Sequence, residues 1–265
     1  MPTHAYGLRI RIAASLLAAG LAAGAAACSH HEAAGYTVVR RYPHDTSAFT
    51  EGLLYSGNVL YESVGLYGRS QVRREDLTTG RVLASVPLAP DRFGEGLALR
   101  GGRLYQLTWK SHVGYVYDAA TLARVDSFAF PGEGWGMTTD GSALIMSDGS
   151  DSLRFFDPHT FATLRELHVR SGGLPLKALN ELEYVDGTLF ANVYQSNSIV
   201  RIDAASGNVT QWLDLSALVP AHDPDPANDV LNGIAYDAAT GDLLVTGKKW
   251  PLLFAIRPDP VGRTR

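Results

Sequence analysis

The sequence predicts an all-β fold: a five-bladed β-propeller built from four-stranded antiparallel blades. Three observations lead to this prediction. A short motif recurs five times, strands of alternating apolar residues separate its copies, and the last repeat lacks a strand that the beginning of the chain can supply. Repeats of about 40–45 residues that each contain four strands are typical of propellers and not of helical repeat proteins.

The recurring motif opens each run of alternating apolar residues, as in Thr50-Glu51-Gly52-Leu53. We call its most variable position the anchor. The five anchors are Glu51, Glu95, Trp135, Asn180 and Asn232. They are 44, 40, 45 and 52 residues apart, and the last interval is long because the segment Pro220–Asp229 is inserted as an expected surface loop. Since the first strand of every blade lines the channel of a propeller, the anchors should gather around one axis.

Each repeat continues as a β-meander. Ten residues beyond each of the first four anchors lies a second apolar strand, containing Tyr61, Tyr105, Ile145 and Phe190. Turns that begin with aspartate, such as Asp76-Leu77-Thr78-Thr79-Gly80, then follow the third strands. Such turns suit hairpins, so each repeat is expected to form one antiparallel blade.

The fifth repeat ends early, because Pro258-Asp259-Pro260 follows its third strand. The alternating segment Tyr36–Tyr42 can supply the missing strand, which would close the ring and remove its open edges. The propeller is therefore predicted to span residues 36–258, followed by a flexible tail at 259–265. An open β-sandwich and two small β domains are the alternatives, but neither explains five registers and one displaced strand.

The first 27 residues have the pattern of a secretory signal peptide. Arg9 and Arg11 precede an apolar run that ends in small residues. A retained membrane helix is the alternative, although the run is short and rich in alanine. Cys28, the only cysteine, follows the expected cleavage point, so residues 28–35 are either a linker or a lipid-attachment segment that tethers the protein to a bacterial membrane. We expect an exported protein, periplasmic or secreted.

Composition limits the partners and the chemistry. The net charge is −4 and no run of lysine or arginine is longer than a pair, so nucleic acid is not an expected partner. We expect a monomer. The eight histidines are scattered and have no cysteine partner, so neither a zinc site nor a cofactor is expected. Calcium is left as an alternative at the acidic residues Asp148, Asp151, Glu181 and Glu183.

The anchors and a second level of side chains predict a pocket at one mouth of the channel. The second level lies fourteen residues past each of the first four anchors, at Gly65, Trp109, Gly149 and Tyr194. Lys248 holds the matching place in the fifth repeat. Phe49 and Phe93 lie two residues before the glutamate anchors. The predicted pocket contains Phe49, Glu51, Phe93, Glu95, Trp109, Trp135, Asn180, Tyr194, Asn232 and Lys248. Simple ion pairing and packing between blades is the alternative explanation.

Seven ordered motifs, from about Tyr42 to Ile256, resemble the glutaminyl-peptide cyclotransferases of the plant and bacterial type. The motifs are Phe49-Thr50-Glu51-Gly52, Gly65-Leu66-Tyr67-Gly68-Arg69-Ser70, Phe93-Gly94-Glu95-Gly96-Leu97, Gly134-Trp135-Gly136, Leu179-Asn180-Glu181-Leu182-Glu183-Tyr184, Leu231-Asn232-Gly233-Ile234-Ala235 and Val245-Thr246-Gly247-Lys248. The resemblance implies a propeller enzyme that needs no zinc. It also implies that peptides and proteins with N-terminal glutamine are the partners, and that this glutamine is converted to pyroglutamate with release of ammonia.

The resemblance further implies roles for the residues at matching positions. Glu95 would be the carboxyl group that transfers protons, with Lys248 and Asn180 completing the catalytic set. The expected substrate-binding residues are Glu51, Phe49, Phe93, Trp109, Trp135, Tyr194 and Asn232. Glu51 and Tyr194 depart from the plant pattern, which has glutamine and tryptophan at these positions.

The implied reaction suits such a pocket. The α-amine must be neutral when it attacks its own γ-amide carbon, the oxyanion must be stabilised, and the leaving nitrogen must gain a proton. Aromatic neighbours raise the pKa of a buried glutamate toward the working pH, and lysine or asparagine can donate to an oxyanion. A periplasmic propeller that binds carbohydrate or peptide without turnover is the alternative, and it would need no desolvated glutamate beside a lysine.

Overall fold

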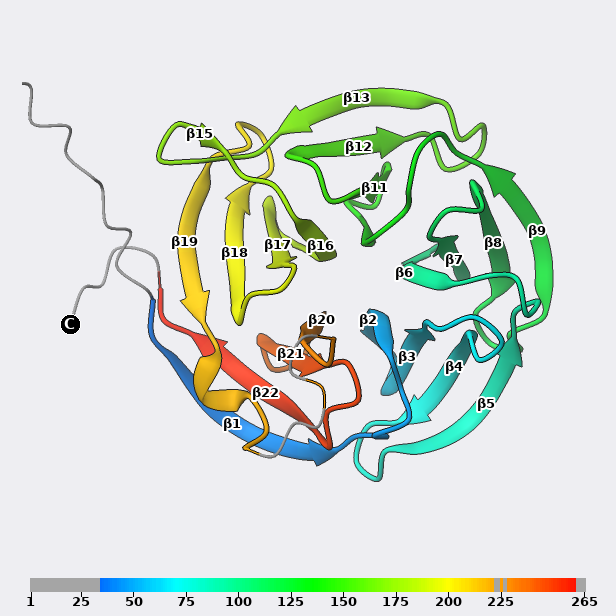
Figure 1. Ribbon diagram of the computed structural model, residues 1–265, viewed down its shortest axis with the longest axis horizontal. Helices are drawn as coiled ribbons and strands as arrows, with labels where there is room; N and C mark the ends of the chain where they lie inside the picture. The colour runs from blue at the N-terminus through cyan, green and yellow to red at the C-terminus, as the bar shows by residue number, and fades with distance from the viewer. Residues whose placement is uncertain (1–33, 222–224, 226–227, 261–265) are drawn as a thin grey trace, which may run out of the picture. The chain divides into compact units, whose positions relative to one another are not determined.

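The computed structural model describes residues 34–221, 225 and 228–260. Within these residues, five four-stranded antiparallel sheets surround a central axis as the blades of a propeller (Figure 1). The predicted fold class is therefore confirmed. The predicted signal peptide, Cys28 and most of the predicted tail lie outside the described residues.

Blades one to four each use four consecutive strands. Blade one contains β2 (Thr50–Ser56), β3 (Val59–Val64), β4 (Gln71–Asp76) and β5 (Arg81–Pro87). Blade two contains β6 (Gly94–Arg100), β7 (Arg103–Thr108), β8 (Val113–Asp118) and β9 (Arg124–Ala129). Blade three contains β10 (Met137–Thr139), β11 (Leu144–Met146), β12 (Ser152–Phe156) and β13 (Thr163–His168). Blade four contains β16 (Leu179–Val185), β17 (Thr188–Val193), β18 (Ser198–Asp203) and β19 (Val209–Asp214).

Blade five joins the two ends of the propeller. It contains β20 (Leu231–Asp237), β21 (Asp242–Gly247), β22 (Leu252–Pro258) and, as its outermost strand, β1 (Tyr36–Pro43). β1 is antiparallel to β22, and their pairing runs from Tyr36 opposite Pro258 to Pro43 opposite Leu252. Figure 1 shows β1 in blue beside β22 in red. The predicted closure by the N-terminal strand is confirmed.

Two small elements lie outside the blades. A hairpin of β14 (Arg170–Ser171) and β15 (Leu174–Pro175) connects blades three and four, and the 3-10 helix η1 (Ser216–Leu218) follows blade four. Among the residues described, no helix has the length and apolar character needed to cross a membrane.

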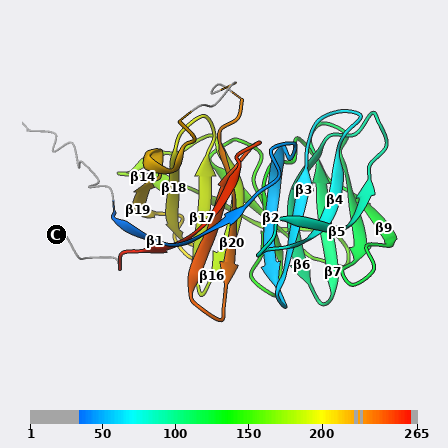
Figure 2. The same ribbon diagram turned by 90° about the horizontal axis from the view of Figure 1, so that it is seen from below.

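Burial falls from the axis outward. The first five residues of β2 are buried, whereas most residues of the outermost strand β5 are exposed. A cluster of buried apolar side chains fills each interface between neighbouring blades, including the interface between blades five and one, where Leu53 packs with Leu244 and Leu253. Turned by 90°, the ring shows its inner strands running from one face to the other (Figure 2). Packing between blades therefore holds the inner strands in place without a disulfide.

The strand ladder is irregular at the anchors. In blades one, two, four and five the pairing of the first and second strands shifts register at the anchor, as it does between Thr50 and Gly52. A bulge turns a side chain out of the regular alternation and is common next to active sites. The bulges therefore aim the anchor side chains at the mouth of the channel.

The residue after the anchor packs against the neighbouring blade. It is glycine in four blades, and a Cβ atom on Gly136 would collide with the backbone oxygen of Asn180. Blade four has Glu181 at this position. Its buried carboxylate accepts hydrogen bonds from the backbone N–H groups of Leu53 at 3.2 Å and Ile234 at 2.7 Å, so it links blade four to blades one and five.

Candidate active site

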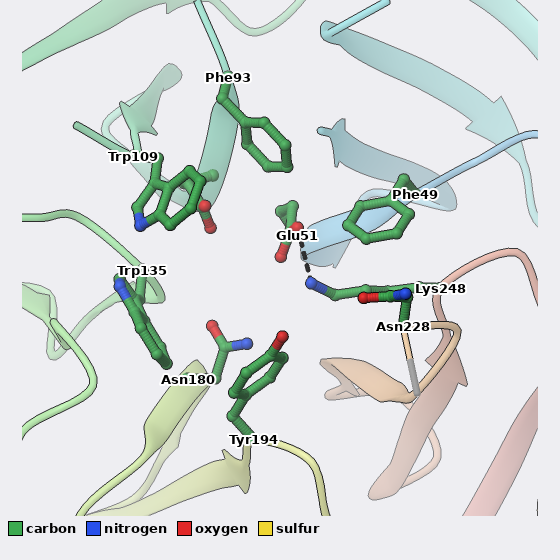
Figure 3. A pocket seen from close by; sticks show the side chains of 10 residues that line it. Phe49, Glu51, Phe93, Trp109, Trp135, Asn180, Tyr194, Asn228 and Lys248 are labelled. Carbon is green, nitrogen blue, oxygen red and sulfur yellow. Dashed lines mark hydrogen bonds and ion pairs between the residues drawn. The ribbon is translucent and has the colours of Figure 1, made fainter. Parts of the chain in front are cut away.

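A cavity of about 240 Å³ opens at the mouth toward which the anchors point (Figure 3). Its lining comes from all five blades and the segments beside them: Phe49, Glu51, Phe93, Glu95, Trp109, Trp135, Asn180, Tyr194, Asn228 and Lys248. Nine of these side chains were singled out from the sequence. The structure therefore brings the predicted residues together, with Asn232 left out of the lining and Asn228 added to it.

Two kinds of position supply the side chains. Glu51, Glu95 and Asn180 belong to the bulged beginnings of β2, β6 and β16. Trp109, Tyr194 and Lys248 each follow the end of a second strand, respectively β7, β17 and β21. Because first and second strands are antiparallel, the beginning of one and the end of the other meet at the same mouth.

Glu51 is fixed through both of its carboxylate oxygens. Lys248 Nζ lies 2.7 Å from Oε1 in a buried ion pair (Figure 3), and Asn232 Nδ2 donates to Oε2 at 3.1 Å. Asn232 also donates to the backbone oxygen of Thr50 at 2.9 Å. Burial raises the pKa of Glu51, while the ammonium group of Lys248 opposes this shift. Asn232 therefore does not line the cavity, and its side-chain amide holds the carboxylate of Glu51 in place.

Glu95 has the opposite surroundings. It is buried, yet it forms no hydrogen bond or ion pair with any residue in the described part of the chain. Burial raises the pKa of Glu95 well above its ordinary value, and the nearby carboxylate of Glu51 raises it further, while Lys248 acts in the opposite direction. Glu95 is therefore a carboxyl group that faces the cavity and holds a proton readily.

Asn180 presents an unused acceptor. Its side-chain Oδ1 atom is buried and has no partner among the described residues, although it lies on the lining of the cavity. Its backbone is fixed, because Ser147 Oγ donates to the Asn180 carbonyl oxygen at 2.6 Å. A buried acceptor without a partner is costly, so this atom is suited to receive a hydrogen bond from a bound molecule.

Aromatic rings form two walls of the cavity. Phe93 makes edge contacts with Phe49 and Trp109, at centroid distances of 6.2 and 5.6 Å, and Trp135 makes one with Tyr194 at 5.5 Å. Lys248 Nζ lies 4.4 Å from the centroid of the Phe49 ring. The rings exclude water from the carboxyl groups and leave space for a flexible side chain between them.

Two residues at the site were not predicted from the sequence. Asn228 comes from the inserted segment before β20, which has no counterpart in the other repeats. Glu133 accepts hydrogen bonds from the indole groups of Trp109 and Trp135. It lies two residues before the anchor Trp135, as Phe49 and Phe93 do before theirs, so the repeat register contained a signal for it.

The acidic residues considered for calcium do not gather. In the described ranges, no three histidine, cysteine, aspartate or glutamate side chains are close enough to hold a metal ion. Asp148 instead accepts a hydrogen bond from Ser150 and forms an ion pair of 3.1 Å with Arg154. Glu181 is bound to backbone N–H groups, as described above. These carboxylates support turns and strands.

Comparison with known proteins assigns the chain. The family model described as glutamine cyclotransferase matches residues 11–257. The chain belongs to the glutamine cyclotransferase family. The resemblance found in the seven motifs is thereby confirmed.

Two members of the family illustrate the similarity. A glutaminyl-peptide cyclotransferase of Arabidopsis thaliana is 43% identical over 242 residues, which cover 90% of this chain and 76% of the plant protein. The crystal structure of Myxococcus xanthus glutaminyl cyclase superposes with a TM-score of 0.78 at 35% identity, covering 84% of this chain and 96% of that one. Family membership thus rests on both sequence and structure.

Proposed function

We propose that the protein is a glutaminyl-peptide cyclotransferase: it converts the N-terminal glutamine of peptides and proteins to pyroglutamate and releases ammonia. The reaction transfers the γ-acyl group from one nitrogen to another within the substrate, which makes the enzyme an acyltransferase. Family membership supports the activity. The single observation that carries the chemistry is a buried glutamate, Glu95, that faces a cavity beside a lysine and has no hydrogen-bond or ion-pair partner among the described residues.

Glu95 is suited to move the proton that the reaction must transfer. The neutral α-amine of the substrate attacks the carbon of its γ-amide, forming a C–N bond and an oxyanion. The carboxylate of Glu95 accepts the proton that the attacking nitrogen loses and then donates it to the departing amide nitrogen, whose bond to carbon breaks. A raised pKa suits this transfer, because it makes the carboxylate of Glu95 a stronger proton acceptor than an ordinary glutamate, and the protonated group can then return the proton to the leaving nitrogen.

Lys248 and Asn180 would fix the reacting amide. Lys248 uses one N–H for Glu51, and the others can donate to the amide oxygen and to the oxyanion that develops from it. The Oδ1 atom of Asn180, which has no partner in the described part of the chain, can accept a hydrogen bond from the substrate. The carboxylate of Glu51 would receive the α-amine, and the aromatic walls would fold the glutamine side chain back onto it. Since both reacting groups belong to one molecule, this restraint supplies much of the catalysis.

Ammonia release from a short peptide that begins with glutamine tests the proposal. Wild-type protein should release ammonia in the presence of a chelator, and Glu95→Gln should lower kcat by about 10²–10⁴-fold, because it keeps the shape of the side chain and removes the proton transfer. Glu166→Gln, at an exposed glutamate of β13, is the matched control and should leave kcat unchanged. A peptide with an acetylated α-amine should give no ammonia. Full activity of Glu95→Gln, or an inert wild type that still binds peptide or sugar, would contradict the proposal.

We propose further that residues 1–27 direct export to the periplasm or beyond and that Cys28 carries a lipid tether. The sequence pattern supports both statements. Cell fractionation of the wild type and of Cys28→Ser tests them. A membrane-bound wild type and a released variant are expected, and two equally soluble proteins would exclude the tether.

A further inference from the structure

We propose that Glu133 is a positioning residue of this active site, whose carboxylate fixes the indole rings of Trp109 and Trp135, one in each aromatic wall of the substrate pocket. The inference rests on the proposed function, because it assigns a role in cyclisation to a residue that does not line the cavity. It is carried by the hydrogen bonds of Glu133 and by the place of this residue between two blades.

A single oxygen atom joins the two rings. Trp109 Nε1 donates to Glu133 Oε2 at 2.7 Å, and Trp135 Nε1 donates to the same atom at 3.1 Å. Indole has only one N–H group, so Glu133 takes the entire donor capacity of both side chains. Trp109 follows β7 of blade two and Trp135 precedes β10 of blade three. The carboxylate therefore sets the angle between walls that come from different blades.

Glu133 is itself held from two sides. Lys110 Nζ lies 3.6 Å from its Oε1 atom and 3.8 Å from the centroid of the Trp109 ring, so this ring is restrained at its edge and on its face. Arg154 donates to the backbone oxygen of Pro131 at 2.7 Å and to that of Glu133 at 3.5 Å. These contacts fasten the loop before Trp135 to blade three, so the carboxylate has little freedom to leave the indoles.

The charge of Glu133 also bears on the proton-transferring group. Partial burial opposes its ionisation, but hydrogen bonds from Trp135 and Trp109, together with the ammonium group of Lys110, outweigh burial and lower the pKa of Glu133. It therefore stays anionic at neutral pH. Its negative charge contributes to the raised pKa of Glu95, after burial and the effect of Glu51. The side chain of Glu133 is 40% exposed, so solvent screens this contribution.

Indole N–H resonances test the contact independently of activity. The protein has four tryptophans, so ¹H–¹⁵N spectra should contain four indole signals. Glu133→Ala should shift the signals of Trp109 and Trp135 and increase their rates of hydrogen exchange. The signals of Trp212 and Trp250 are internal controls, because their N–H groups donate to Ser171 Oγ and to the backbone oxygen of Asp229. Four unchanged signals would overturn the proposal.

Kinetics test the consequence. Glu133→Ala should lower kcat/KM for a glutamine-initiated peptide by about 10–100-fold, the range expected for lost charge-assisted hydrogen bonds. Glu133→Gln keeps an acceptor oxygen and should retain most of kcat/KM, while the acidic limb of its pH profile should move to lower pH, because a negative neighbour of Glu95 has gone. Glu166→Gln should show neither effect, and melting temperatures report whether each variant is folded.

The outcomes separate this inference from the proposed function. If the wild type releases ammonia and Glu133→Ala keeps full kcat/KM with shifted indole signals, the rings need no positioning and the inference fails alone. If the wild type releases no ammonia, the proposed function fails. Titration with the same peptide, followed by the indole signals, then still decides whether Glu133 positions the binding wall: equal affinity of wild type and Glu133→Ala would overturn that role.

Discussion

Glu51 and Glu95 occupy equivalent positions in blades one and two, yet their surroundings differ. Glu51 is bound by Lys248 and Asn232, whereas Glu95 has neither kind of partner in the described part of the protein. Two neighbouring carboxyl groups with different environments can hold different protonation states at one pH. The pair therefore combines a carboxyl group held by an ion pair and a hydrogen bond with one that is free to exchange its proton.

The effect of Glu51 on Glu95 gives a prediction with a definite sign. The carboxylate of Glu51 raises the pKa of Glu95, and Lys248 lowers it. Glu51→Gln removes the first influence and leaves the second, so the limb of the pH profile of kcat/KM that Glu95 governs should move to lower pH. Activity against a glutamine-initiated peptide between about pH 5 and 9 measures this shift. An unchanged profile would show that the two carboxyl groups are not coupled.

Site residues were predictable where the repeat register reached them. Trp109, Tyr194 and Lys248 hold equivalent places after second strands, so the period of the sequence gathered them on one mouth. Asn232 is also an anchor, but its side chain binds Glu51 and does not line the cavity. The repeat register could not predict this difference, since it gives the level of a residue in the channel and not its hydrogen bonds. Asn228 belongs to an insertion, about which a repeat contains no information.

At the scale of elements, the connection from β1 to β2 contains a buried ionic contact that joins blades five and one. His44 Nε2 lies 3.2 Å from Glu62 Oε1 in β3, and His44 Nδ1 lies 2.7 Å from the backbone oxygen of Trp250. Burial alone would lower the pKa of His44, but the carboxylate of Glu62 outweighs burial and raises it from 6.5 to about 9. Protonated His44 therefore stabilises the fold.

The contact between His44 and Glu62 should make the free energy of unfolding decrease as the pH rises. A raised folded-state pKa means that the contribution of His44 is complete below pH 6.5 and is lost as the pH rises through about 9. Burial also raises the pKa of Glu75 to about 8, which acts in the same direction. The free energy of unfolding should fall by on the order of 1–3 kcal/mol between pH 6 and 9.5.

Denaturant titrations at several pH values measure this loss. His44→Gln should be less stable at pH 6 and should show a shallower decrease toward pH 9.5, since one of the contributing groups is missing. His168→Gln is the matched control, because the side chain of His168 is 59% exposed. An equal slope in wild type and His44→Gln would rule out the assigned role of His44.

At the scale of the whole molecule, the prediction of a closed ring depended on one incomplete repeat. Closure was predicted because the fifth repeat lacks a fourth strand and the segment Tyr36–Tyr42 belongs to no other repeat. In the structure, β1 pairs with β22 along its length. Positions at the axis were less predictable. Glu181 follows an anchor, where the other blades have glycine, and its contacts with Leu53 and Ile234 arise only when the ring is assembled.

Closure by β1 should dominate stability. A protein that begins at His44 lacks β1, which leaves the edge of β22 open and uncovers apolar side chains near Phe254. Compared with a protein that begins at Ala34, it should lose roughly 5 kcal/mol or more of unfolding free energy, which is comparable with the whole stability of many domains, or it should aggregate. Denaturant unfolding and light scattering compare the two.

Adding the missing strand supplies the control for that truncation. A synthetic peptide of residues 36–43 should bind the truncated protein and recover part of its stability, while a peptide with the same residues in scrambled order should not. Equal unfolding midpoints for the two proteins without peptide would mean that the ring does not depend on this strand.

The cavity takes at least one lining residue from every blade or from the segment beside it. Copies of a repeat that arise by duplication begin with identical residues, whereas the five anchors of this propeller are of three types: glutamate, tryptophan and asparagine. Each blade contributes its own lining residues from one stretch of the sequence. Exchange of a single blade between relatives would replace the lining residues of that blade, which makes the blade a natural unit for altering which chain ends the protein accepts.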